Sequence, residues 1–340
     1  MDQALLPLLL VALASVFQGT FGLGMKKTAP LKWAAWWLLY AAIAMVVAPW
    51  VWAVAAVPDL WGSIAGAPRG AVALGAFFGF LWGIGGILFG LGVSHIGMSL
   101  TYGIVMGLAG SIGSLAPLFQ TGGGGPAVPY VLLGVGVMAG GVAVVAWAGV
   151  KRDRAAATAG MEIAGVRKGR GFQKGLLIAV LSGILSALLN VGFANAAPVA
   201  ETAISHGANP RNASLAAWVV VLAGAFVMNA GYAIILLVKR RRGAPEAAER
   251  SPWTAAGWAV LTGILWFAAL GVYGQGAALM GTLGPVIGWP ILLGLALIVS
   301  NLWAVASGEW RGAREAMSWM FAGVAILITA CALLGYSNSL

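Results

Sequence analysis

Cysteine, histidine and charged residues are all scarce in this chain of 340 residues, which holds one cysteine, two histidines and 8% charged residues. The lone Cys331 excludes a disulfide within one chain. His95 and His206 are far apart in the sequence and lack the neighbouring ligands that a metal site needs. No Ser–His–carboxylate set can be assembled from them either. We therefore expect neither an enzyme nor a metal or other cofactor.

The shortage of charge accompanies an excess of apolar residues, which make up 61% of the chain. A soluble domain of this size needs far more charge to cover its surface. Apolar runs of about twenty residues follow one another from end to end, and such runs cross a bilayer as helices because backbone groups in hydrocarbon must be paired within the segment. The first run has no small-residue cleavage site followed by a soluble domain, so we expect a retained helix and not a signal peptide. The prediction is an all-α integral membrane protein with ten transmembrane helices, at 4–24, 33–57, 71–93, 98–119, 128–150, 175–197, 213–238, 255–275, 283–306 and 316–336.

Basic residues are concentrated in alternate loops. The loops after spans 1, 5, 7 and 9 hold three, seven, five and two of the 19 Lys and Arg residues, and the other loops hold Arg69 and Arg211. By the positive-inside rule the basic loops are cytoplasmic, so both termini are predicted to be periplasmic in a bacterial inner membrane. The net charge of +10 could also indicate nucleic-acid binding. That function needs basic and aromatic residues interleaved on one folded surface, so we expect no nucleic-acid partner.

The longest polar stretch, residues 151–174, separates five spans from five. We interpret residues 1–150 and 175–340 as two five-helix repeats joined by a basic cytoplasmic linker. Because five is odd, the second half must cross the membrane in the opposite sense to the first. Two such halves form an inverted repeat, an arrangement typical of secondary transporters.

Two internal sequence matches support this repeat. Residues 79–97 align without a gap with residues 263–281, and several glycines and one tryptophan coincide. A weaker match aligns residues 14–30 with residues 182–198. Glycine matches are common in a chain with 51 glycines, whereas a tryptophan in register with them is informative.

Trp82 and Trp266 are the coinciding tryptophans, and both lie mid-span, away from the interfacial belts where tryptophan usually collects. An indole face stacks well against an apolar ring face, such as the C–H face of a sugar. We interpret the pair as the wall of a small-molecule site, with core packing as the alternative. The polar residues that we predict to line the same site are Gln18, Asn190, Tyr273 and Gln275. Each could instead be a residue that hydrogen-bonds one helix to another.

Carboxylates are missing from the middle of the predicted spans. All nine lie at span ends or in loops, whereas proton-coupled transport normally uses a carboxylate or histidine inside the membrane. Glu201 is the candidate for proton coupling because it follows Pro198, which is expected to kink or end span 6. Sodium coupling through carbonyl and Asn oxygens at this break, or transport without coupling, are the alternatives.

Several short motifs follow one another along the chain: Trp82-Gly-Ile-Gly, Gly90-Leu, Gly97-Met-Ser, Lys168…Lys174-Gly-Leu, Asn195-Ala-Ala with Glu201, Leu265-Trp266…Tyr273 and Glu309-Trp310. In these motifs the chain resembles the L-rhamnose–proton symporter family of the drug/metabolite transporter superfamily. The resemblance implies ten helices in two inverted halves, an alternating-access pathway between them, and a sugar or related solute.

The predicted function is inner-membrane secondary transport of a small solute, a sugar such as a deoxyhexose, by alternating access. The expected partners are this solute, a proton or sodium ion, and membrane lipid. Gly86, Leu88, Phe89 and Pro285 stand where the resemblance leads us to expect polar groups, which favours an exporter of amphipathic metabolites or drugs as the alternative. A membrane structural or partner subunit without transport activity is the alternative from another class.

Overall fold

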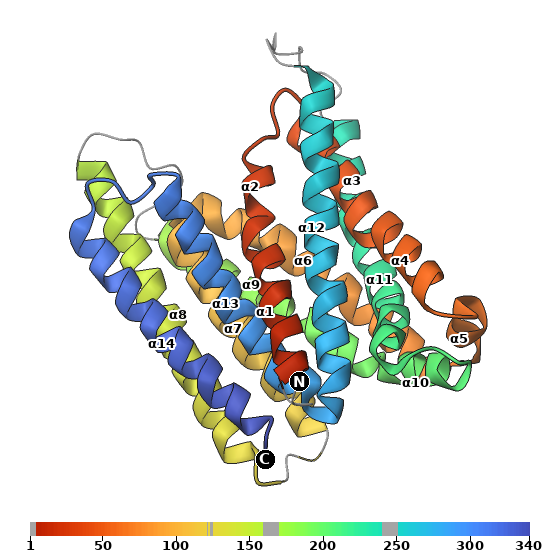
Figure 1. Ribbon diagram of the computed structural model, residues 1–340. Helices are drawn as coiled ribbons and strands as arrows, with labels where there is room; N and C mark the ends of the chain where they lie inside the picture. Colours follow the sequence, from red (N-terminus) through yellow and green to blue (C-terminus); the bar gives the residue numbers. More distant parts are fainter. Residues whose placement is uncertain (1–4, 121, 123–124, 159–169, 240–250) are drawn as a thin grey trace.

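The computed structural model describes residues 5–120, 122, 125–158, 170–239 and 251–340, and helices make up its architecture (Figure 1). Ten segments in this part of the chain are long and apolar enough to cross a membrane, which confirms the ten predicted spans. The helices of the first five spans are α1 (Leu5–Thr20), α2 (Gly22–Met25), α3 (Trp33–Ala42), the π-helix η1 (Ile43–Val47), α4 (Ala48–Ala56), α5 (Leu60–Gly66), α6 (Arg69–Ile96), α7 (Met98–Gln120) and α8 (Val128–Thr158). Those of the last five are α9 (Arg170–Asn195), α10 (Ala197–Ser205), α11 (Pro210–Lys239), α12 (Pro252–Leu279), the 3-10 helix η2 (Gly281–Leu283), α13 (Gly284–Ala306) and α14 (Arg314–Ser337).

Both chain ends lie at the same end of the bundle (Figure 1), as an even number of spans requires. We call this the terminal end; it also holds α5 and α10. The opposite end, which we call the basic end, holds α2, the ends of α8 and α11 and the start of α14. The basic residues on or next to these segments are Lys26, Arg152, Lys239 and Arg314. Helices α8 and α9 extend into the predicted linker 151–174, as far as Thr158 and from Arg170, and the residues between them lie outside the described part.

The predicted break in span 6 is confirmed. Helix α9 ends at Asn195, and α10 begins at Ala197 with Pro198 in its first turn, where a proline costs no helical hydrogen bond. Span 1 is also interrupted, because α1 ends at Thr20 and the short α2 begins at Gly22. The interruption of span 1 lies near the basic end, whereas that of span 6 lies at the terminal end.

The helices of the two halves pack against one another. Helix α1 lies against α12 and α13, whereas α9 lies against α6 and α7. Helices α8 and α14 pair along one edge of the bundle (Figure 1). Each half thus inserts its first helix between two helices of the other half. This arrangement agrees with two related halves, and the inverted relation itself stays a prediction.

Glycine lets α6 and α11 approach until their backbones touch. A Cβ on Gly79 would lie 1.9 Å from the Val221 carbonyl oxygen, and one on Gly224 would lie 1.8 Å from that of Ala76. Small residues at such crossings allow the close van der Waals packing that holds helices together in lipid, where there is no hydrophobic driving force between them. The crossing fixes the height of α6 against α11 and thereby places Trp82, three residues beyond Gly79.

The terminal end of the bundle is much more closely packed than the basic end. Every residue is buried in four runs: 189–193 of α9, 213–222 of α11, 269–277 of α12 and 286–294 of α13. All four runs lie in the terminal half of their helices. In the basic halves of these helices no more than two consecutive residues are buried, so the packing loosens toward the basic end.

Candidate solute-binding site

Trp82 of α6 and Trp266 of α12 stack on each other in the middle of the bundle. Their ring centroids are 5.4 Å apart, with 28° between the planes. Trp266 is 4% exposed, whereas Trp82 is half-buried. No solute fits between rings this close, so a solute that meets the pair must contact the outer face of Trp82. The sequence repeat thus identified two side chains that the fold brings into contact.

Helix α3 extends this aromatic wall. Tyr40 meets the edge of Trp266 at 6.3 Å between centroids, and Trp37 lies 5.0 Å from Tyr40. Trp33 stacks on Trp37 at 5.1 Å. Sequence reasoning missed these three residues, although their spacing of three and four positions along span 2 marks one helix face.

Asn229 of α11 is the polar group within this wall. Trp37 Nε1 donates a hydrogen bond of 3.1 Å to Asn229 Oδ1, and Asn229 Nδ2 donates to the Ala225 carbonyl. Gly83 leaves room for the amide, since a Cβ there would lie 3.1 Å from Asn229 Nδ2. The indole and the amide orient each other beside the Trp82–Trp266 stack.

Gln18 of α1 offers an unused hydrogen-bond acceptor. Its Oε1 atom is buried and has no hydrogen-bond partner among the described residues. A buried acceptor without a partner costs about 1–3 kcal/mol, so a hydroxyl group of a bound solute would relieve this cost. Gln18 is thus a candidate for hydrogen bonding to a polyol.

Asn190 and Tyr273 lie closer to the terminal end and are bonded to each other. Tyr273 Oη donates a hydrogen bond of 2.6 Å to Asn190 Oδ1. Asn190 Nδ2 donates to the carbonyls of Gly113 and Pro285, each at 2.8 Å. Both side chains are fully buried. The Asn190 amide therefore joins α7, α9, α12 and α13 and has no free donor for a solute.

Further contacts close the same end. Trp289 Nε1 donates to the Ala109 carbonyl at 3.0 Å, and Ser114 Oγ donates to that of Val286 at 2.5 Å. Gln275 is buried as well and donates to Asn212 Oδ1 at 3.3 Å. The six predicted site residues thus do not form one cluster. Trp82 stacks on Trp266, and Asn190 bonds to Tyr273. Gln275 bonds to Asn212, and Gln18 lies on α1, which packs against α12 and α13.

Glycines at matched positions of the repeat show how the two ends differ. A Cβ on Gly274 of α12 would lie 2.5 Å from Trp218 Nε1, whereas its match on α6, Gly90, has no neighbour within 4 Å. Gly86, one turn from Trp82, also has none. The face of α6 that runs from Trp82 toward the basic end is therefore open.

Glu201, the predicted coupling residue, is exposed on α10. It makes no hydrogen bond or ion pair with the part of the chain that the structure describes. No three His, Cys, Asp or Glu side chains of the described residues lie close enough to hold a metal ion.

Comparison with known proteins agrees with this architecture. The sequence model of the L-rhamnose-proton symport protein family matches residues 4–339. The chain belongs to this family. Relatives named L-rhamnose-proton symporter include those of Cronobacter sakazakii (strain ATCC BAA-894), 27% identical over 320 residues, and Klebsiella pneumoniae subsp. pneumoniae, 27% identical over 324 residues. Each alignment covers 91% of both chains.

Membership of the L-rhamnose-proton symport family confirms the resemblance seen in the motifs. The match includes all ten spans, so the molecule is a multi-pass membrane transporter of the inner membrane and not an enzyme. The alternatives of an exporter and of a structural subunit are not favoured by these findings.

Proposed function

We propose that this member of the L-rhamnose-proton symport family imports a monosaccharide with an apolar face, a deoxyhexose such as L-rhamnose. The observation that carries the proposal is the mid-membrane stack of Trp82 and Trp266, flanked by Tyr40 and Asn229. A methyl group in place of a hydroxyl enlarges the apolar face of the sugar that an indole contacts. Asn229 and the unpaired Gln18 oxygen would bind hydroxyl groups.

The conformation supports transport by alternating access, with this structure open toward the basic end. The terminal end is closed by the Asn190 hydrogen bonds and the aromatic contacts around Tyr273. The open face of α6 beyond Trp82 leads toward the other end. We assign Asn190, Tyr273 and Gln275 to closure of the terminal end in this conformation, in place of the solute contact predicted for them.

The basic loops support an orientation in which the basic end faces the cytoplasm. We expect a cysteine at Asn209 to react with a membrane-impermeant thiol reagent in intact cells, and one at Ser251 to react only in inverted vesicles. Both positions are exposed, at the terminal end and the basic end respectively. The native Cys331 is replaced by alanine in both variants. The reverse labelling pattern would overturn this orientation.

Proton coupling is proposed to use Glu201. Two further ionisable groups, His206 and Asp59, lie at the same end. His206 follows α10 and bonds through Nδ1 to Asp59 Oδ2 at 2.7 Å. The hydrogen bonds from His206 and from the Gly62 backbone hold the pKa of Asp59 below its usual range. Asp59 therefore stays ionised near neutral pH, which leaves Glu201 as the unpaired carboxylate of this group. In the proposed orientation all three groups face the periplasm, the side from which protons would enter.

Glu201→Gln is expected to abolish solute accumulation driven by a pH gradient while leaving solute exchange across the membrane intact. A neutral side chain cannot carry the proton, although the solute site is unchanged. The measurement is uptake of L-rhamnose into proteoliposomes under separate proton and sodium gradients. Arg69→Gln, a neutral substitution elsewhere at the terminal end, is the control. Undiminished proton-driven accumulation in Glu201→Gln would refute the assignment, and accumulation driven by sodium alone would refute proton coupling.

A further inference from the structure

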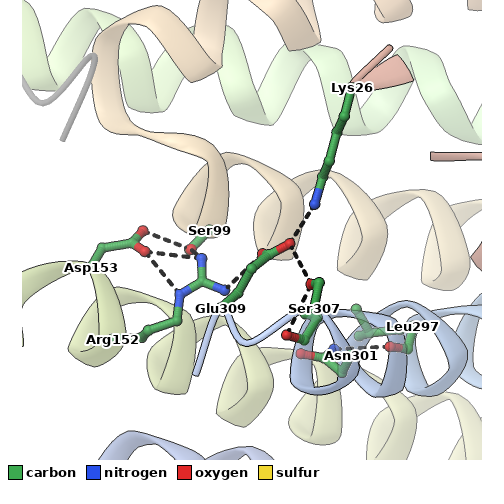
Figure 2. Close-up of polar contacts among 9 residues, drawn as sticks. Lys26, Ser99, Arg152, Asp153, Leu297, Asn301, Ser307 and Glu309 are labelled. Atoms are coloured by element: carbon green, nitrogen blue, oxygen red, sulfur yellow. Dashed lines mark hydrogen bonds and ion pairs between the residues drawn. The ribbon is translucent and has the colours of Figure 1, made fainter. Parts of the chain in front are cut away.

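The break between α1 and α2 leaves a short helical turn at the basic end, followed by Lys26. Helix α2 spans Gly22–Met25, and Phe21 at its start makes no side-chain capping hydrogen bond. A Cβ on Gly22 would have no neighbour within 4 Å. Lys26, 60% exposed in its side chain, forms an ion pair with Glu309, its one ionic partner among the described residues. This pair ties the end of span 1 to the loop between α13 and α14 (Figure 2).

Glu309 itself is held from the opposite side. Ser307 Oγ donates to Glu309 Oε1 at 3.1 Å, and Arg152 Nη1 of α8 lies 3.6 Å from Glu309 Oε2. The loop turns sharply at Gly308 and Gly312, both with φ near +80°, a conformation that glycine adopts without strain. The carboxylate is therefore placed by its own loop as well as by α8.

Arg152 is in turn fixed by three neighbours. Its Nη2 and Nε atoms donate to Asp153 Oδ1 at 3.0 and 3.2 Å, and Nη2 also donates to Ser99 Oγ at 3.3 Å. The guanidinium lies 5.0 Å from the ring centre of Trp310. Figure 2 shows Arg152 with Asp153 and Ser99 on one side of Glu309, and Lys26 approaching Glu309 from the other side.

The charges keep Glu309 ionised. Partial burial raises the pKa of Glu309, but the hydrogen bonds from Lys26 and Ser307 and the charges of Lys26 and Arg152 outweigh burial, so the pKa is lowered. At neutral pH the pair is therefore between full charges. Lys26 is the more exposed partner, and Glu309 makes the additional contacts with Ser307 and Arg152.

The closed terminal end shows which contact the basic end lacks. There, Asn190 of α9 reaches Tyr273 of α12. In the sequence alignments of the two halves, Gly22 matches Asn190 and Phe89 matches Tyr273. A Cβ on Gly22 would have no neighbour within 4 Å, and Phe89 is partly exposed. Closure of the basic end would thus bring the end of span 1 toward Phe89 of α6, away from Glu309.

We propose that Glu309 is a latch that holds Lys26 and α2 beside the loop between α13 and α14 and thereby keeps the basic end of the pathway open. The latch rests on the proposed alternating-access function. In the opposite conformation Lys26 leaves Glu309, and α2 moves toward α6. Glu309 then acts as a positioning residue for transport, without contact to the solute.

The test measures thiol-labelling rates in purified protein in detergent, where both ends are reachable and neither the orientation nor the solute matters. One reporter is Gly86→Cys, on the open face of α6, and the other is Ala278→Cys, which lines a small hollow at the terminal end. Both are made with Cys331→Ala. In Glu309→Gln and Lys26→Met, the labelling rate is expected to fall about two- to five-fold at Gly86→Cys and to rise at Ala278→Cys. A fold-change of this size corresponds to the loss of one ion pair with an exposed partner.

Two controls separate the latch from general effects of charge. Lys27→Met removes a neighbouring exposed charge, and Glu315→Gln breaks the pair that Lys151 of α8 makes with Glu315 of α14. Neither should change the two rates, and Lys26→Arg should keep them near those of the native chain. If Glu309→Gln fails to fold, Lys26→Met still decides, since Lys26 is largely exposed. Unchanged rates in folded Lys26→Met would overturn the latch, whatever uptake assays show of the solute.

Discussion

Trp82→Ala and Trp266→Ala are each expected to weaken binding of the transported monosaccharide about five-fold or more. Losing one stacking ring costs on the order of 1 kcal/mol beyond the loss of buried area. Trp82 offers the face that remains free in the stack, and Trp266 supports that face from behind at 5.4 Å. Equilibrium binding of L-rhamnose to the purified variants measures the effect.

Matched substitutions show whether the site or the fold is affected. Trp253→Ala removes an indole that is 83% exposed at the start of the same helix as Trp266, and binding should not change. Trp82→Phe keeps an aromatic face and should lose less affinity than Trp82→Ala. Normal binding in both alanine variants would show that the indoles only pack the core and would remove the observation on which the proposed function depends.

The ten spans could be predicted from sequence because hydrocarbon leaves a long apolar run few alternatives to a helix. The break before Pro198 was predictable for the same local reason, since proline lacks the N–H that a helix interior requires. The π-helix at Ile43–Val47 has no such local signal. It lies against Gly263 of α12, where an added Cβ would be 2.9 Å from Ile43 Cβ. Its position therefore depends on a contact between distant segments.

The candidate site was predictable in part. The register of the repeat identified Trp82 and Trp266, and the structure stacks them. Depth in the membrane also selected Asn190 and Tyr273, but depth does not tell whether a polar group faces a pathway or a partner. Their hydrogen bond to each other, and those from Asn190 to the carbonyls of Gly113 and Pro285, join residues 77 to 95 positions apart in sequence. Only the fold reveals that these bonds leave the amide with no free donor.

Asn190→Ala is expected to open the terminal end. The substitution leaves the Tyr273 hydroxyl and two backbone carbonyls without their partner in a fully buried place. Each unpaired group costs about 1–3 kcal/mol if it stays buried. The free energy of the conformation with the terminal end closed therefore rises relative to a conformation in which water reaches these groups. Labelling of Ala278→Cys should therefore accelerate about tenfold or more. The rate is measured in purified protein that also carries Cys331→Ala.

Graded variants distinguish a gate from a solute ligand. Tyr273→Phe removes one of the three hydrogen bonds of Asn190 and should accelerate labelling less than Asn190→Ala. Asn195→Ala, which removes an amide bonded to Gln120 at 3.3 Å near the surface of the same helix, should have little effect. If Asn190 is part of a gate, Asn190→Ala changes which end of the bundle is open but leaves the exposed face of the Trp82–Trp266 stack unchanged, so the solute still binds. If Asn190→Ala instead abolishes L-rhamnose binding at an unchanged labelling rate, Asn190 contacts the solute and the terminal end is closed by other groups.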